Sequence, residues 1–397
     1  MQVVIHRGAH QIGGCCTEIR TDTTRILIDL GAELPDPQAL PPKALEVQGV
    51  TRGTPDCGGV FFTHYHGDHV GLYDQILPGI PLYMGRAAKD IFALYQERVK
   101  DHLPDRSQYA RFLARVQTFS PARPVQVGDI RVTPFLVDHS AYDAYMFLIE
   151  ADGKKILHTG DYRFHGFRGK GVLPTLEKYV GQVDLLITEG TTLSRPDEKP
   201  VTERELSCQA QEVMREFPYA FLLCSSTNID RLAGMAAAAK KAGRLFVCDD
   251  YQKSVLDVAT RHGGSRSSLY DFSGVRVYSE SLLDEMKDKG FCMPVRANQG
   301  AKRFMKRFPI AKSLLIYSMW TGYRERDDRI AGFLNGTNYC DLHTSGHADT
   351  EAIRAVCHAV QPRLGVIPIH TQASDRFDAV CTPYTVIQVY DGNHYIF

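Results

Sequence analysis

The stretch that decides the fold is GGVFFTHYHGDH (residues 58–69), where an apolar run leads directly into three histidines and an aspartate. Imidazoles placed this closely are costly, because protonated rings repel one another and each ring needs a partner when buried. A bound cation removes that cost. A tight turn beyond the strand can direct His64 and His66 to one metal ion, and Asp68 and His69 then face a second ion. The stretch therefore predicts a metal site at the end of a buried strand.

The types of donor narrow the choice of metal. Imidazole and carboxylate without thiolate suit Zn²⁺, Mn²⁺ or Fe²⁺, and zinc is the default. The alternative for this stretch alone is a histidine-rich surface turn that binds metal only by accident. One loop supplies too few donors for a catalytic metal pair, so further ligands have to come from elsewhere in the chain.

Other apolar runs also end in residues that can do chemistry. Each run is typical of a buried strand, with the polar residue at or just beyond its carboxyl end. The residues are Asp29 after RILI, His64 after VFFT, His139 after PFLVD, Asp161 after ILHTG, Glu189 in LLITE and His370 after GVIPI. This shared placement is what a single site at one edge of a sheet produces. His139, Asp161 and His370 are the predicted remaining ligands, and Asp161 is suited to bridge two cations.

The sequence pattern changes in the second half of the chain, where predicted helices alternate with predicted strands. Thr202 and Glu205 form a predicted capping box at the start of a helix. The strand YAFLLCSS (219–226) then precedes a helix from Asn228 to about Lys241. Strand, helix and strand in succession imply a parallel crossover, which predicts a separate α/β domain.

Length and composition fit this division. A chain of 397 residues exceeds the usual size of one hydrophobic core. We predict an inserted domain over residues 196–339 and a larger, discontinuous domain made of residues 1–195 and 340–397. The chain is 44% hydrophobic and 23% charged with a formal net charge of zero, as in an ordinary globular enzyme. Any binding of nucleic acid therefore depends on a local patch or on bound cations.

The start of the chain and its cysteines indicate a compartment. MQVVIHRGAHQIGG lacks the apolar core of a secretory signal, and no run approaches the roughly 20 apolar residues of a membrane span. The ten cysteines show no CxxC spacing, which disfavours a zinc knuckle and a secreted disulfide framework. We expect a cytoplasmic protein with no membrane partner and with reduced cysteines.

Motifs along the chain occur in the order of a known family. They are Asp29, the HxHxDH run, His139, Asp161, Glu189 in TEGTT, the SSTNIDR segment, His347 in SGHAD and His370 in PIHT. The first four resemble the metallo-β-lactamase superfamily, and the whole series resembles its β-CASP nucleases, including the ribonuclease J group. The resemblance covers nearly the whole chain. It implies an α/β fold, namely an αββα sandwich with residues 196–339 as the inserted β-CASP domain.

The resemblance also implies a ligand set. It places His64, His66 and His139 on one metal, Asp68, His69 and His370 on the second, and Asp161 between the two. Asp29 then orients a ligand imidazole rather than binding metal itself. The chain departs from the family pattern at Gly190, where serine is frequent, and at Thr371-Gln372, where ribonuclease J relatives usually have Gly-Glu.

Three residues are candidates for proton transfer during phosphodiester hydrolysis. Two metals can activate water and clamp a phosphate, but the departing alkoxide still needs a proton. His347 is the candidate general acid, and Glu189 would hold it protonated and correctly turned. Asp68 is the candidate proton acceptor. The alternatives are a polar core histidine for His347 and a capping or solvent carboxylate for Glu189.

Further residues are candidates for contact with the substrate. Ser140, Ser226 and Asn228 can offer hydroxyl, amide and backbone N–H groups to a phosphate, although N-capping alone would also explain the last two. His343 and Ser345 precede His347, and we assign them to the same substrate-binding set, His343 on its place in the ribonuclease J-like pattern.

Together these features predict a two-metal nuclease that hydrolyses RNA, as an exoribonuclease, an endoribonuclease or both, with single-stranded nucleic acid as its partner. The alternatives are a DNA nuclease of the Artemis-like repair type, a small-molecule hydrolase of the same superfamily, and an inactive scaffold. His370 favours RNA, because the Artemis-like group tends to have an apolar residue there. Since the chain ends soon after its last expected strands, we expect neither the C-terminal domain of many ribonuclease J proteins nor oligomerisation through it.

Overall fold

The computed structural model describes residues 1–34, 44–102, 105, 107–195, 199–264 and 267–397. These residues form two compact units. Unit 1 contains Met1–Phe164, Arg168–Lys199 and Gly346–Phe397, and unit 2 contains His165–Phe167 and Pro200–Ser345. The predicted boundary after residue 195 borders residues outside the described part, and the predicted boundary after residue 339 falls within unit 2.

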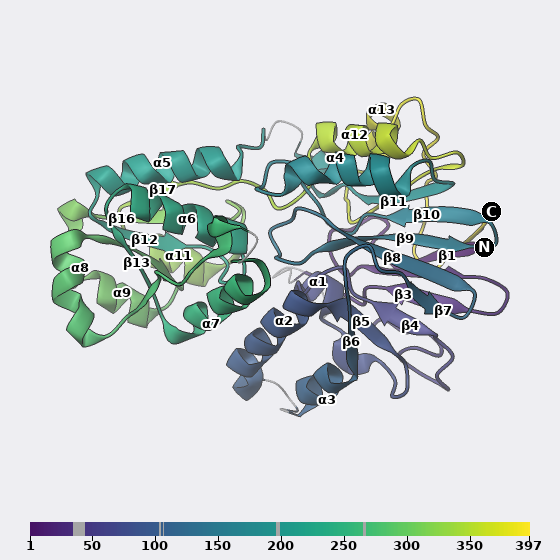
Figure 1. Ribbon diagram of the computed structural model, residues 1–397, viewed down its shortest axis with the longest axis horizontal. Coiled ribbons are helices and arrows are strands. Elements are labelled where there is room, and N and C mark those ends of the chain that lie inside the picture. Colours follow the sequence, from purple (N-terminus) through teal and green to yellow (C-terminus); the bar gives the residue numbers. More distant parts are fainter. Residues whose placement is uncertain (35–43, 103–104, 106, 196–198, 265–266) are drawn as a thin grey trace. The chain divides into compact units, whose positions relative to one another are not determined.

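Unit 1 is built on two mixed sheets (Figure 1). The strands of the first are β1 (Gln2–Arg7), β2 (Cys16–Arg20), β3 (Arg25–Ile28), β4 (Gly59–Phe61), β5 (Leu82–Gly85), β6 (Val116–Phe119) and β19 (His394–Ile396). The strands of the second are β7 (Val125–Val127), β8 (Ile130–Leu136), β9 (Tyr145–Ala151), β10 (Lys154–His158), β11 (Leu185–Glu189) and β18 (Gly365–Ile369). Their orders are β19-β1-β2-β3-β4-β5-β6 and β18-β11-β10-β9-β8-β7.

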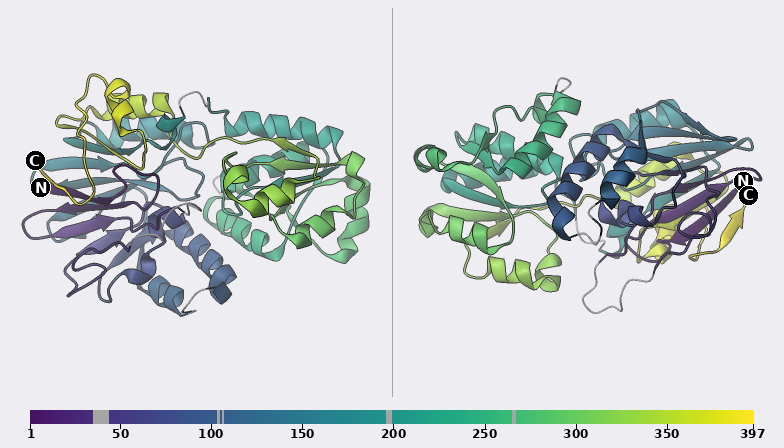
Figure 2. Two further views of the ribbon diagram at one scale, coloured as in Figure 1. Left: turned by 180° about the vertical axis from the view of Figure 1, so that it is seen from behind. Right: turned by 90° about the horizontal axis from the view of Figure 1, so that it is seen from below.

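Strand direction determines where the strand ends lie. β3 and β4 are parallel, and so are β10, β11 and β18. β8 and β10 are each antiparallel to β9, so they run the same way as each other. The carboxyl ends of these strands therefore lie at a common edge within each sheet. β1 pairs with β19, which places the two chain ends side by side (Figure 2).

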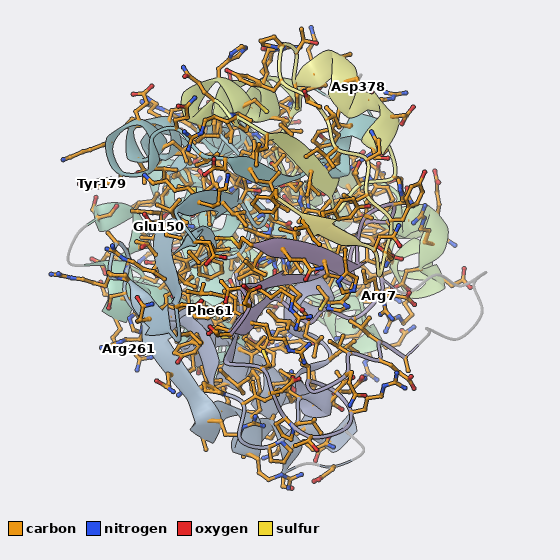
Figure 3. The ribbon with its side chains drawn as sticks, turned by 90° about the vertical axis from the view of Figure 1, so that its right-hand side faces the viewer. Arg7, Phe61, Glu150, Tyr179, Arg261 and Asp378 are labelled. Atoms are coloured by element: carbon orange, nitrogen blue, oxygen red, sulfur yellow. The ribbon has the colours of Figure 1, made fainter. Side chains whose placement is uncertain are left out.

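A hydrophobic core fills the space between the two sheets. Ile5, Ile28 and Phe61 from the first sheet belong to the same buried cluster as Phe147 and Ile187 from the second. Phe61, which is labelled in Figure 3, is fully buried. Burying an apolar side chain of this size contributes about 1.5–3 kcal/mol, so this layer is what holds the sheets face to face.

Helices cover the outer faces of both sheets, which completes the predicted αββα sandwich (Figure 1). On the first sheet they are α1 (Gly67–Val70), α2 (Arg86–Val99) and α3 (Gln108–Arg115), and on the second α4 (Val172–Thr175), α12 (Thr350–Val360) and α13 (Phe377–Val380). Leu157 and Leu186 of the second sheet share a buried cluster with Ile353 and Val356 of α12. Phe62, just after β4, packs edge-on against Phe112 of α3, with ring centroids 5.7 Å apart.

Unit 2 contains a third sheet in which all strands are parallel. Its strands are β12 (Tyr219–Leu223), β13 (Leu245–Cys248), β14 (Arg276–Val277), β15 (Phe291–Val295), β16 (Ser313–Tyr317) and β17 (Tyr339–Asp341), in the order β14-β13-β15-β12-β16-β17. Its helices are α5 (Glu203–Glu216), α6 (Ile229–Lys241), α7 (Asp250–Ala259), α8 (Leu283–Lys289), α9 (Gln299–Met305), α10 (Tyr323–Arg326) and α11 (Asp328–Leu334).

The local predictions for unit 2 are confirmed. The Thr202 side chain accepts a hydrogen bond from the Glu205 backbone N–H, and the Glu205 side chain accepts one from the Thr202 backbone N–H. Asn228 caps α6, which ends at Lys241 as expected. A buried ion pair of 2.8 Å between Glu203 and Arg231 joins α5 to α6.

Candidate metal centre

The strand ends bring polar side chains to one edge of the sandwich in unit 1. Asp29 follows β3, the turn with His64, His66, Asp68 and His69 follows β4, His139 follows β8, Asp161 follows β10, Glu189 ends β11, and His370 follows β18. Asp29 and His370 leave their strands with φ of 63° and 52°, a left-handed conformation that side-chain-bearing residues adopt rarely. The edge is thus formed by residues that are far apart in the sequence.

One carboxylate oxygen, Oδ2 of Asp161, lies at the middle of this group. Its nearest imidazole nitrogen is Nε2 of His69 at 3.1 Å, followed by Nδ1 of His347 at 3.5 Å. The Nε2 atoms of His64, His139 and His370 each lie 3.9 Å from it. Asp161 is 2% exposed, so this carboxylate is surrounded by ring nitrogens rather than by solvent.

Two sets of donors lie on either side of Asp161. One nitrogen from each of His64, His66 and His139 lies within 4.8 Å of the others, and His66 Nδ1 is 3.3 Å from His139 Nε2. On the other side, Asp68 Oδ2 lies 3.2 Å from His370 Nε2. We call these sets the imidazole group (His64, His66, His139) and the mixed group (Asp68, His69, His370).

Hydrogen bonds fix which nitrogen each buried ring directs to the centre. The Nδ1 contacts are His64 to Thr63 Oγ1 at 3.0 Å, His69 to Asp29 Oδ2 at 2.8 Å, His139 to the Gly346 carbonyl at 2.6 Å, and His370 to Thr191 Oγ1 at 2.7 Å. The Thr63 hydroxyl donates to Asp29 at 2.8 Å, and the Thr191 hydroxyl donates to the His370 carbonyl at 3.2 Å. Both hydroxyls therefore accept from Nδ1–H, and each Nε2 keeps its lone pair for another partner.

The atoms at the centre fit a bound cation. His64 Nε2, His69 Nε2 and Asp161 Oδ2 are buried, and none of them has a hydrogen-bond partner among the described residues. Buried polar atoms are rarely left in this state, because each costs about 1–3 kcal/mol. Neutral imidazole and carboxylate are the donors that divalent transition metals bind. The cluster can therefore hold divalent metal.

Electrostatics favours neutral rings in the imidazole group but not at His69, where Asp161, Asp29 and Asp68 outweigh burial and raise the pKa. Burial lowers the pKa of His64 and His139, and it lowers the pKa of His66 to about 4, so these rings are neutral at neutral pH. Burial opposes ionisation of Asp161, yet its pKa lies well below the ordinary value because His370, His69 and His347 surround it. The imidazole group is uncharged and Asp161 is an anion, which suits metal binding.

His347 and Glu189 form a pair beside this centre. His347 Nδ1 lies 3.1 Å from Glu189 Oε2, and Glu189 is fully buried. Burial disfavours the imidazolium, but attraction to Glu189 and Asp161 outweighs it and raises the pKa of His347 to about 9. The His347 side chain is 22% exposed and that of Asp68 is 15% exposed, so solvent reaches the centre on their side.

The predicted substrate-contacting residues fall into two places. Ser140 lies at the centre, with Oγ 3.4 Å from His139 Nε2. Ser226, Asn228, His343 and Ser345 belong to unit 2. There Asn228 caps α6 by accepting a hydrogen bond from Arg231 at 3.2 Å, and the Ser345 carbonyl accepts one from His165 at 2.7 Å. A phosphate-binding role for all of these residues stays a prediction.

Sequence reasoning missed the groups that orient the rings and one possible donor. Thr63, Thr191 and the Gly346 carbonyl have no spacing that distinguishes them from other hydroxyls and carbonyls. Cys15 was also missed, because the donor set was expected to lack thiolate. Its Sγ and one nitrogen each of His69 and His370 lie within 4.8 Å of one another.

The two departures from the family pattern have a packing explanation. A Cβ at Gly190 would lie 2.4 Å from the Phe377 ring, so a serine there would collide with α13. The Thr371 hydroxyl donates to the Gly190 carbonyl at 2.8 Å. Gly190, Thr371 and Phe377 thus form one local arrangement behind His370.

The family comparison agrees with this fold and this cluster. Residues 24–217 match the family model described as the β-lactamase superfamily domain. This part of the chain therefore resembles the metallo-β-lactamase superfamily in sequence as well as in fold. Among the helices that the structure describes, none has the length and apolar character needed to cross a membrane.

Individual proteins with similar sequences show which members of the superfamily this chain resembles. Ribonuclease J of Mycobacterium tuberculosis is 24% identical over 396 residues, a match that covers 93% of this chain and 68% of the relative. Ribonuclease J of Sinorhizobium meliloti is 25% identical over 252 residues, covering 59% of this chain and 42% of the relative. An RNase J-like protein of Methanocaldococcus jannaschii is 28% identical over 225 residues, covering 53% and 48%. This chain is thus similar to proteins named ribonuclease J, which confirms the resemblance seen in its motifs.

Two further observations concern how much of each relative the chain matches and which solved structure it resembles. The chain spans less than half the length of the Sinorhizobium and Methanocaldococcus relatives. A crystal structure of a protein of unknown function from Enterococcus faecalis V583 superimposes with a TM-score of 0.79 at 22% identity, covering 100% of this chain and 99% of that one. That likeness supports the fold.

Proposed function

We propose that this protein is a two-metal hydrolase that cleaves phosphodiester bonds in single-stranded RNA. The observation that carries the proposal is the placement of Asp161 Oδ2 between the imidazole group and the mixed group. The buried Nε2 atoms of His64 and His69 lie close to it and lack a hydrogen-bond partner among the described residues. The names of the curated relatives support RNA as the substrate. A cytoplasmic location remains a prediction.

The donors divide into two metal sites. His64, His66 and His139 would hold one ion, Asp68, His69 and His370 would hold the other, and Asp161 would contribute to both. Zinc is the proposed metal and manganese the alternative, because imidazole and carboxylate accept both. When bound, the ions lower the pKa of a water molecule and neutralise phosphate oxygens.

His347 is the proposed general acid. Its Nδ1 contacts Glu189, and Nε2 is the proposed donor of a proton to the departing alkoxide. Glu189 fixes the ring and stabilises its protonated form. Asp68 is the proposed proton acceptor on the attacking side, since its side chain reaches both solvent and the centre.

The test is a time course on end-labelled RNA that carries either a 5′ monophosphate or a 5′ hydroxyl, with Asp161→Ala as the matched inactive control. We expect wild-type protein loaded with zinc or manganese to cleave the RNA and the variant to be inactive. The pattern of labelled products separates cleavage at an end from internal cleavage. Single-stranded DNA of the same sequence, a thioester and a lactam complete the set. Faster turnover of any of these than of RNA would replace the RNA proposal, and no turnover of any substrate would leave an inactive scaffold.

A further inference from the structure

Cys15 lies beside the mixed group, on the loop between β1 and β2. It is 3% exposed, and its Sγ lies within 4.8 Å of donor nitrogens on His69 and His370. His69 Nε2 is one of the buried atoms that lack a hydrogen-bond partner among the described residues. The thiol thus lies close to a ring that carries an unsatisfied nitrogen.

Backbone hydrogen bonds hold Cys15 in this position. Its N–H donates to the Asp68 carbonyl at 3.0 Å, and its carbonyl accepts from the Gly31 N–H at 2.9 Å. A Cβ at Gly31 would lie 1.7 Å from the Asp68 carbonyl oxygen and 2.9 Å from the Cys15 nitrogen, so only glycine permits this close approach. The loop that carries Cys15 is therefore fixed to the metal-binding turn.

The same loop also contacts the end of β18. The His370 N–H donates to the Gly8 carbonyl at 2.7 Å. Asp68, His370 and Cys15 are therefore held together by the main chain, and the position of the thiol does not depend on side-chain packing alone.

We propose that Cys15 Sγ is a ligand of the metal ion held by the mixed group. This inference rests on the proposed two-metal function and adds a soft donor that neither the predicted ligand set nor the family comparison assigns. When sulfur binds the ion, the thiol releases its proton to solvent. Thiolate favours zinc and cobalt over manganese, so Cys15 makes the mixed group selective for zinc.

Cobalt substitution tests the inference by a readout that does not depend on activity. Metal-free protein is titrated with Co²⁺, and the absorption spectrum is recorded for wild type, Cys15→Ser and Cys16→Ser. Cys16 is the matched control, because it is the buried neighbour on β2 and belongs to none of the groups of possible metal ligands in the described residues. We expect a sulfur-to-cobalt charge-transfer band in wild type and Cys16→Ser, and its loss in Cys15→Ser with the ligand-field bands retained.

The affinity for zinc gives a quantitative test of the same inference. Cys15→Ser should lower zinc affinity at one of two sites by at least about tenfold, since even groups that only orient ligands have effects of 10- to 100-fold. Manganese affinity should change far less. A cobalt spectrum of wild type with ligand-field bands but no charge-transfer band overturns the role of Cys15 and leaves the two-metal proposal intact, whereas failure to bind cobalt or zinc overturns both.

A measurement on wild type alone covers the case in which Cys15→Ser does not fold. X-ray absorption at the zinc edge of protein with two zinc ions should show a sulfur shell at about 2.3 Å, with one sulfur for every two zinc ions. Nitrogen and oxygen shells without sulfur would exclude Cys15 as a ligand.

Discussion

The imidazole group and the mixed group use opposite means to attract a cation. The imidazole group offers three neutral rings, which burial keeps unprotonated, and it obtains negative charge only from Asp161. The mixed group has its own carboxylate in Asp68, with Asp29 behind His69 and the thiol of Cys15 beside it. If the two groups bind one ion each, as proposed, this difference predicts that the ions are held unequally. We expect a chelator to remove the ion of the imidazole group first.

The largest effect is expected for substitution of Asp161, the carboxylate that both groups share. Asp161→Ala deprives both groups of their common anion, so metal content should fall from two equivalents to less than one. Hydrolysis of RNA should decrease by more than about a hundredfold, because residues that merely orient ligands already account for 10- to 100-fold. Elemental analysis and turnover measure the two effects. Retention of two equivalents would refute the central position of Asp161.

Removing one histidine from each group compares the metal affinities of the two groups directly. His139→Ala should abolish binding at the imidazole group, and His370→Ala should abolish it at the mixed group, so each variant should retain about one equivalent of metal. Titration of metal-free protein with zinc by calorimetry gives stoichiometry and affinity for each. We expect the ion that remains in His139→Ala to be the tighter one. Two equivalents in His370→Ala would remove that residue from the ligand set.

Changing a residue that orients a ring should produce a smaller effect confined to one group. Thr191→Val keeps the shape of the side chain but removes the hydroxyl that binds His370 Nδ1. Zinc affinity should fall by about 10- to 100-fold at the mixed group and stay unchanged at the imidazole group. Thr192→Val is the control, because the Thr192 hydroxyl donates to the Ala348 carbonyl and not to a ring. Equal effects of both substitutions would indicate a general packing defect.

The smallest effect concerns the proton donor and depends on pH. The raised pKa of His347 keeps its acid form present below about pH 9 and removes it as the pH rises through that value. Glu189→Gln removes the largest attraction that raises this pKa, so the alkaline limb of kcat/KM should move down by about one pH unit or more. Metal content should not change. Glu150→Gln, on β9, is the control. If the alkaline limb of the kcat/KM profile stays in place in Glu189→Gln, Glu189 does not set the pKa of His347.

The sequence made the principal strands and the residues at their ends predictable. Apolar runs followed directly by Asp29, His139, Asp161 or His370 gave both the element and its polar end, because a buried strand and its turn leave a strong pattern. The capping box at Thr202 and the helix after Asn228 were predictable for the same reason, since their signals are local.

The remaining parts of the centre depend on contacts between distant segments. Thr63 follows a strand like many other threonines, and only the fold shows that its hydroxyl lies between Asp29 and His64. The Gly346 carbonyl that binds His139 leaves no trace in the sequence, because every residue has a carbonyl. Cys15 was overlooked because a single thiol has no spacing to match, and its proximity to His69 arises from main-chain hydrogen bonds across a loop.

The left-handed backbone at Asp29 and His370 has a consequence for substitutions at these two positions. Each such residue costs roughly 1–2 kcal/mol relative to glycine, and the fold keeps both where chemistry needs a carboxylate and an imidazole. Replacing His370 by glycine would relieve this strain, but it would also leave a cavity and remove the hydrogen bond to Thr191, so the melting temperature of the metal-free protein should not rise. Packing and hydrogen bonding around the ring thus offset the backbone strain, and the strained residue fixes the direction in which the side chain leaves the strand.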